Sequence, residues 1–181
     1  DSYQASLQYF GTETTLYAFS PERFTWRLVP GRREIAAATA TVPGLNAPTD
    51  NLEISSRPNA LLLFNPVYDN GPGGFGHSRV KNRYREISPL HNIRKGMPPA
   101  IVFLGTRDKL VPVETGRTFK KKMEAVGSRS ELFLYKDQPH GFFNRRSSPE
   151  HFLATVTEMD RFLKSLGYLD GPPTIRVDNN K

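Results

Sequence analysis

Two polar residues that can carry acid–base chemistry each follow a short apolar run in the second half of the chain. Asp108 comes after "AIVFLGTR", and His140 comes after "ELFLYKDQP". Runs this short, apolar at consecutive positions, favour strands of a parallel sheet that are buried on both faces, and such sheets place working residues at the carboxyl ends of their strands. A carboxylate beside a histidine orients the imidazole ring and stabilises the imidazolium ion that forms when the ring takes a proton. We therefore predict that Asp108 and His140 meet in one catalytic site.

The segment between the two apolar runs predicts how the pair is brought together. Residues 113–126 place Phe119, Met123 and Val126 on one helical face, and Gly127 is a natural stop. A right-handed crossover through this helix makes the two strands neighbours, so both loops reach the same edge of the sheet. Taken singly, an aspartate in a turn and a histidine in a glycine-containing loop are more often structural. Their placement at the ends of adjacent strands favours the catalytic interpretation.

Further elements complete the expected architecture. A third apolar run covers 60–64, a small-residue helix is expected at 35–42, and a weaker strand at 24–29. Ser148 is expected to cap a last helix, with Pro149 in its first turn and an apolar stripe behind it, formed by Phe152, Val156, Met159, Leu163 and Leu166. Alternating strands and helices predict a three-layer α/β/α sandwich with a mostly parallel sheet.

A long excursion separates the first two apolar runs. Residues 66–97 are rich in Gly, Asn and Arg, and loops of this length are often functional. Four of its side chains could form a wall of a substrate site: Tyr68, Phe75, His77 and Tyr84. A plain structural loop is the equally weighted alternative.

The two loop motifs resemble those of a known family. "GTRDKLVP" is similar to the acid loop, and "HGF" to the histidine loop, of α/β-hydrolases of the esterase/lipase kind. The resemblance is closest to acetyl-esterase-like enzymes and more distant to dienelactone hydrolases and the prolyl oligopeptidase catalytic domain. It implies an α/β-hydrolase fold whose N-terminal strands are missing from this chain. It covers about residues 34 to 169.

The resemblance also implies a reaction. In that family a triad runs Ser, Asp, His in chain order, which makes Asp108 the orienting acid and His140 the general base of carboxylic-ester hydrolysis. Its substrates are small-molecule esters, with acetyl esters as one expectation, and no cofactor is implied. The nucleophile is expected on a G-x-S-x-G elbow before residue 35, but its place falls on Pro30, with Arg32 and Arg33 where glycines belong. A catalytically inactive fragment or interaction module is therefore the alternative to an active serine esterase.

This mismatch sets the expected division of the chain. Residues 1–33 are interpreted as a divergent or damaged remnant, 34–169 as the C-terminal part of the hydrolase domain, and 170–181 as a disordered tail. A degenerate paralogue, a fragment whose N-terminal half is encoded elsewhere, and a shifted reading frame all remain open for 1–33. A truncated sheet is expected to leave an edge and an apolar face open around 60–64, which a missing N-terminal half or a partner chain would cover.

Composition narrows the other possibilities. The chain has 181 residues, a formal net charge of +7 and no cysteine, so disulfides, Cys-based metal sites and a cysteine nucleophile are excluded. The four histidines lack metal-ligand spacing. The positive charges are scattered and accompany no nucleic-acid-binding motif, so we expect no nucleic-acid partner. We expect no membrane span, because no apolar run is long enough, and no signal peptide within this sequence, while the localisation is left open.

Overall fold

A computed structural model describes residues 17–20, 25–28, 40–42, 58–173 and 175 of the chain. Its elements follow the order β1 (Tyr17–Ser20), β2 (Thr25–Leu28), β3 (Ala60–Phe64), α2 (His77–Val80), η1 (Lys81–Glu86), η2 (Pro89–His91), β4 (Ala100–Gly105), α3 (Val113–Ala125), β5 (Ser130–Tyr135) and α4 (Pro149–Ser165). The three predicted apolar strands and the two longer predicted helices are confirmed within a few residues.

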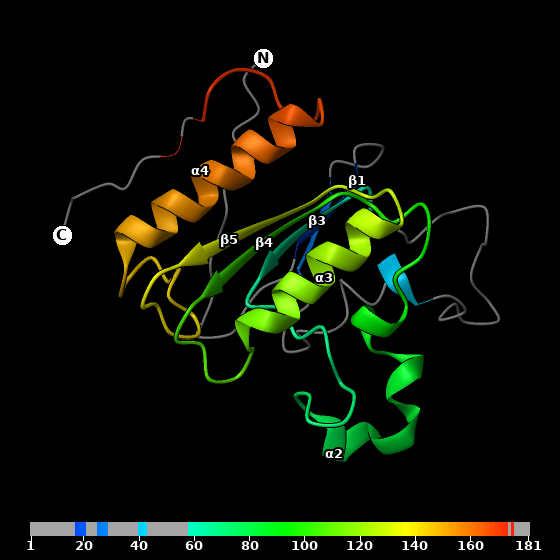
Figure 1. Cartoon of the computed structure of the whole chain (residues 1–181). Coiled ribbons are helices and arrows are strands. Elements are labelled where there is room, and N and C mark those ends of the chain that lie inside the picture. The colour runs from blue at the N-terminus through cyan, green and yellow to red at the C-terminus, as the bar shows by residue number, and fades with distance from the viewer. Residues whose placement is uncertain (1–16, 21–24, 29–39, 43–57, 174, 176–181) are drawn as a thin grey trace.

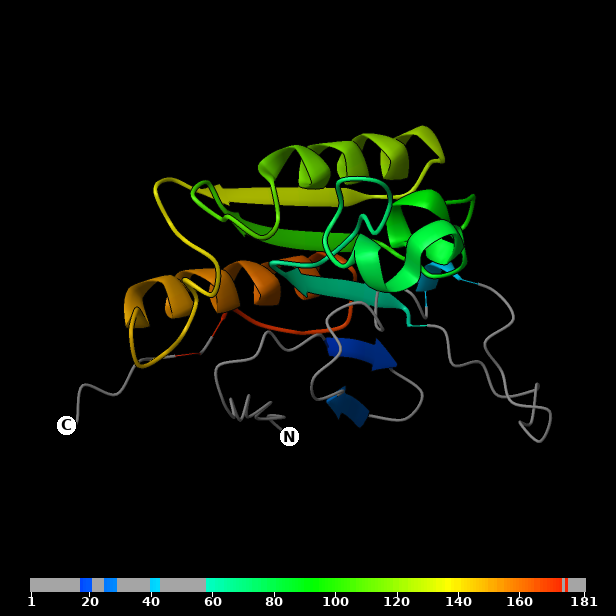
Figure 2. The same cartoon turned by 90° about the horizontal axis from the view of Figure 1, so that it is seen from below.

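The strands form one sheet in the order β2-β1-β3-β4-β5. The expected parallel sheet consists of β3, β4 and β5, with Leu62 opposite Ile101 and Ile101 opposite Glu131. The strand predicted at 24–29 is present as β2, but it pairs antiparallel with β1, which in turn lies antiparallel to β3. Figure 2 shows these two strands in blue beyond β3.

Helices cover both faces of the parallel strands, α3 on one side and α4 on the other (Figure 1). The alternation of side chains along β3 and β4 explains this arrangement. Leu61, Leu63, Val102 and Leu104 belong to the core that contains α3, whereas the residues between them belong to the core that contains α4. Burying both sets gives each face the apolar surface that a helix needs.

Two sequence predictions about burial are wrong. The open apolar face expected around 60–64 is not observed, because Leu61, Leu62 and Leu63 have 0% of their surface exposed and β1 pairs along the strand edge. Two-sided burial also fails for β5, where Leu134 is 37% exposed. β5 ends the order of described strands, so no described strand pairs with its outer edge.

The helix ends follow the expected chemistry only in part. After α3, Gly127 adopts a positive φ of 78°, and the Ser128 amide donates to the Met123 carbonyl at 2.9 Å, which closes the helix. Before α4, Ser148 occupies the N-cap position and Pro149 the first turn. The Ser148 hydroxyl does not cap the backbone, however, because it lies 2.6 Å from Nδ1 of His151.

Other predicted segments lie wholly or partly outside the described residues. Of the helix expected at 35–42, only residues 40 and 41 are described as helical. Most of the expected remnant 1–33, including Pro30, is not described. Within the tail 170–181, Ile175 packs against the core cluster of α4, while 174 and 176–181 lie outside the described residues. The boundaries of 1–33, 34–169 and 170–181 therefore remain predictions.

Candidate active site

The acid loop begins where β4 ends. Asp108 turns back on its own loop, since its Oδ1 accepts hydrogen bonds from the amides of Leu110 at 2.8 Å and Val111 at 2.9 Å. Such a turn is one that an aspartate side chain forms readily. The Asp108 side chain is fully shielded from solvent, with 0% of its surface exposed. One carboxylate oxygen is thereby fixed, and the other, Oδ2, is left for a different partner.

The histidine loop begins where β5 ends, and backbone contacts join it to the acid loop. The Thr106 amide donates to the Tyr135 carbonyl at 2.9 Å, and the Arg107 amide donates to the Gln138 carbonyl at 2.9 Å. The Thr106 hydroxyl in turn accepts a hydrogen bond of 2.7 Å from the Asp137 amide. Three hydrogen bonds therefore fix the distance between the two loops. The loops begin at the arrowheads of the neighbouring strands β4 and β5 (Figure 1).

Gly105 permits this close approach. A Cβ atom placed on Gly105 would lie 2.2 Å from the Gln138 carbonyl oxygen and 2.8 Å from the Pro139 oxygen. Real side chains do not tolerate such distances, so only glycine lets the end of β4 pack against the histidine loop. The first two residues of "GTRD" thus have a geometric role: glycine gives the loops room, and Thr106 joins them.

The structure brings the two predicted residues together. Nδ1 of His140 lies 2.7 Å from Oδ2 of Asp108, and the His140 side chain is 18% exposed. A carboxylate at this distance requires a proton on Nδ1, because two acceptors would otherwise face each other. In the neutral ring Nε2 is then the basic nitrogen. This is the geometry in which a histidine is oriented by an acid on one side and acts as a base on the other.

Hydrogen bonding keeps the acid ionised. Burial by itself raises the pKa of Asp108, but hydrogen bonds from His140 and from two backbone amides outweigh that effect and leave the pKa below its usual value of 3.8. Asp108 is therefore a carboxylate at neutral pH. A negative charge next to Nδ1 stabilises the imidazolium ion that a proton-accepting histidine must become.

A third polar residue reaches the same place from β3. Nδ2 of Asn65 lies 2.6 Å from Oδ2 of Asp108 and 3.2 Å from Nδ1 of His140. The sequence prediction missed Asn65, although it follows the buried run 60–64 directly, just as Asp108 and His140 follow their runs. Applying the strand-end argument to all three strands would have found it.

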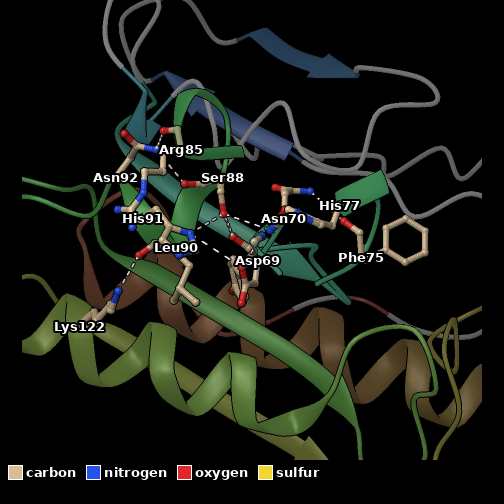
Figure 3. A network of polar contacts seen from close by, with 12 residues as sticks. Asp69, Asn70, Phe75, His77, Arg85, Ser88, Leu90, His91, Asn92 and Lys122 are labelled. Atoms are coloured by element: carbon tan, nitrogen blue, oxygen red, sulfur yellow. Dashed lines mark hydrogen bonds and ion pairs between the residues drawn. The ribbon is translucent and has the colours of Figure 1, made fainter. Parts of the chain in front are cut away.

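A second polar network lies in the excursion and superficially contains the residue types of a triad (Figure 3). The Ser88 hydroxyl and a carboxylate oxygen of Asp69 lie 2.9 Å and 3.8 Å from the same atom, Nδ1 of His91. In a working triad the acid and the nucleophile contact opposite nitrogens of the ring. Ser88 is also fully buried and donates to the Tyr68 carbonyl at 3.0 Å. This network therefore anchors the excursion.

The side chains considered for a substrate wall make structural contacts. Tyr68 is 1% exposed and stacks on Phe119 of α3 with ring centroids 4.0 Å apart. Nδ1 of His77 contacts the Asn70 carbonyl at 2.8 Å, and the Tyr84 ring lies edge-on to that of His91. Phe75 packs against the core beneath α3. These contacts favour the structural alternative for the excursion over the substrate wall.

The part of the chain that the structure describes contains no candidate metal site and no candidate membrane-spanning helix. No cluster of three or more His, Asp or Glu residues there could hold a metal ion. None of the described helices is long and apolar enough to cross a bilayer. The position at which the resemblance places the nucleophile, Pro30, lies outside the described residues.

The fold and the site together define a class. Parallel strands with helices on both faces, and an acid and a histidine on neighbouring loops at the carboxyl edge, are the features of an α/β-hydrolase fold. The sequence profile described as "Dienelactone hydrolase family" matches residues 75–168, and the chain belongs to this family.

Individual relatives agree with this assignment. "Esterase LipC" of Mycobacterium tuberculosis is 39% identical over 62 residues, which cover 33% of this chain and 15% of LipC. The apo form of esterase 2 of Thermogutta terrifontis matches with a TM-score of 0.69 and 38% identity, over 77% of this chain and 54% of that one. The same esterase phosphoramylated by tabun matches with a TM-score of 0.70 and 39% identity, over 77% and 53%. The chain thus spans about half the length of these esterase structures and a smaller share of LipC.

Proposed function

We propose that the chain is part of a carboxylic-ester hydrolase of the serine-esterase type, in which Asp108 orients His140 and His140 is the general base. The observation that carries this proposal is the 2.7 Å contact between Nδ1 of His140 and the shielded carboxylate of Asp108. Membership of the dienelactone hydrolase family and the likeness to esterase structures support it.

The proposed reaction uses the other ring nitrogen. Nε2 of His140 takes the proton of a serine hydroxyl as its oxygen attacks the ester carbonyl, and the Asp108 carboxylate stabilises the resulting imidazolium ion. The imidazolium then gives the same proton to the leaving alcohol, and an acyl-enzyme remains. Water, deprotonated by Nε2 in the same way, hydrolyses the acyl-enzyme to the carboxylic acid and restores the serine.

The substrate that we propose is a small-molecule ester with a short acyl group, such as an acetyl ester. The structures similar to this chain include the Thermogutta terrifontis esterase described with propionate bound and with butyrate bound. Both ligands are short carboxylic acids, the product class of such a reaction. Because the chain spans about half of these structures, a missing N-terminal half or a partner chain is proposed to complete the site.

A non-catalytic module of the same fold is the second candidate. It is favoured by one feature of the sequence: Pro30, Arg32 and Arg33 stand where the resemblance places the serine and two glycines of the nucleophile elbow. Proline has no nucleophilic group, and arginines hinder the tight turn that exposes a serine.

Covalent capture with paraoxon separates the two candidates. Paraoxon phosphorylates activated serines, and one structure similar to this chain is the Thermogutta esterase phosphorylated by it. With the missing N-terminal half or partner chain in place, we expect intact-mass spectrometry to show one diethylphosphoryl group for the wild type and none for His140→Ala, with peptide mapping locating the nucleophile. A matched control, His151→Gln, changes a histidine that contacts Ser148 instead and should still be labelled. If the wild type stays unlabelled with its missing half or partner in place, the esterase proposal is refuted and the module is supported.

A further inference from the structure

Asn65 is held in an unusual backbone conformation at the carboxyl end of β3. Its backbone amide continues the strand pairing by donating to the Phe103 carbonyl at 2.9 Å. Its φ of 45° lies in the left-handed region, where asparagine is tolerated better than most residues with a side chain. The residue is completely buried. Strand pairing and this turn together direct the side chain at the neighbouring loops.

The two ends of the Asn65 amide are in very different surroundings. Nδ2 lies 2.6 Å from Oδ2 of Asp108, whereas Oδ1 is buried and has no hydrogen-bond partner among the described residues. The carboxylate fixes this orientation, since a carbonyl oxygen so close to it would be repelled. The unfavourable burial of Oδ1 is thus offset at the nitrogen, in a hydrogen bond to a charged acceptor.

Asn65 and the acid loop hold different oxygens of the same carboxylate. The backbone amides of Leu110 and Val111 hold Oδ1, so the position of Oδ2 depends on other groups. Oδ2 is the atom that faces His140, and Asn65, which directly follows β3, donates a hydrogen bond to it. The ring can keep its proton on Nδ1 only while Oδ2 stays in place.

We propose that Asn65 is a positioning residue, which holds Oδ2 of Asp108 against Nδ1 of His140 and so keeps the ring proton on Nδ1 and Nε2 as the basic nitrogen. This inference rests on the proposed function, because it assigns Asn65 to the same acid–base pair. It assigns no contact between Asn65 and a substrate. Because Nδ1 of His140 carries a proton, its 3.2 Å contact with Nδ2 of Asn65 brings two donors together and is not a hydrogen bond, so Asn65 acts through Asp108.

The test reads the ring directly and needs no turnover. ¹⁵N NMR of the His140 imidazole, at a pH where the ring is neutral, gives the ratio of the Nδ1–H form to the Nε2–H form. Asn65→Gly removes the amide and tolerates the positive φ, so it adds no backbone strain. Asn92→Gly is the matched control, because Nδ2 of Asn92 donates to the carbonyls of Arg85 and Ser88 in the excursion.

The expected result is a wild-type ring in the Nδ1–H form and a ratio lowered about tenfold by Asn65→Gly, the loss typical of a hydrogen bond to a charged group. Asn92→Gly should lower stability and leave the ratio unchanged. An unchanged ratio in Asn65→Gly would overturn the role of Asn65 and leave the acid–base pair intact. A wild-type ring in the Nε2–H form would instead overturn the pair itself, and with it the proposed function.

A second measurement covers the case in which Asn65→Gly does not fold. In the wild type the Asn65 side-chain amide protons should exchange with solvent more slowly than those of an exposed asparagine. Asp108→Ala should speed that exchange, because it removes the acceptor at 2.6 Å while Asn65 stays buried. Rapid exchange in the wild type, or an exchange rate that Asp108→Ala leaves unchanged, would contradict the proposal.

Discussion

Gly105→Ala is expected to separate the acid loop from the histidine loop. The new Cβ would lie 2.2 Å from the Gln138 carbonyl oxygen, and ordinary contact begins at 3.4 Å, so the loops must move apart by about 1.2 Å. A movement of that size breaks the 2.9 Å hydrogen bond from the Arg107 amide to Gln138. It also takes the 2.7 Å contact between Asp108 and His140 to about 3.9 Å, beyond hydrogen-bonding distance. Overpacking and one lost hydrogen bond together cost about 2–4 kcal/mol of folding stability.

Urea unfolding and ¹⁵N NMR of the His140 ring measure the two effects of this substitution. Gly96→Ala is the matched control, because a Cβ there meets nothing within 4 Å and only its φ of 81° is strained. That strain should cost about 1–2 kcal/mol and leave the ring unchanged. If Gly105→Ala were no less stable than Gly96→Ala, with the His140 ring still in the Nδ1–H form, the reasoning about the packed loops would be refuted.

Two further predictions concern the network that anchors the excursion. Ser88→Ala should lower the free energy of unfolding by about 2–3 kcal/mol in urea titrations, because it removes the hydroxyl that accepts a 3.1 Å hydrogen bond from the buried backbone amide of Asn70. A loss below 0.5 kcal/mol, about the size of the effect of a surface substitution, would contradict this. His91 should make the fold acid-labile, because burial lowers its pKa below the usual 6.5 despite the Asp69 carboxylate, while Lys122 and Arg85 lower it further. The unfolded chain then binds a proton first, so the free energy of unfolding should fall as the pH drops below 6.5, and His91→Gln should flatten that slope.

The sequence predicted the parallel part of the fold well, for an identifiable reason. The runs 60–64 and 100–104 are apolar at every position, and the structure buries every residue of both, as two-sided packing requires. The run 131–135 looks similar, yet β5 ends the described sheet and exposes Leu134. Composition within one strand does not tell whether a neighbour follows. The antiparallel β1 was also not predicted, because its place in the sheet depends on strands elsewhere in the chain.

Strand ends predicted two of the three polar residues that meet at the site. Asp108 and His140 were placed together because one crossover joins their strands, and the 2.7 Å contact confirms that they meet. Asn65 was missed because an asparagine before a proline also suits an ordinary turn. The packing of Gly105 against the Gln138 carbonyl involves two loops that are distant in sequence, so no local pattern indicates it.

Hydrolysis of p-nitrophenyl acetate tests most directly whether Asp108 and His140 are the acid and base of an esterase site. With the missing N-terminal half or partner chain in place to supply the serine, the wild type should hydrolyse this ester faster than His140→Ala by about 10²- to 10⁴-fold, the usual contribution of a general base. Asp108→Ala should approach the rate of His140→Ala, and His151→Gln should keep the wild-type rate. Equal rates for the wild type and His140→Ala would contradict the proposed function.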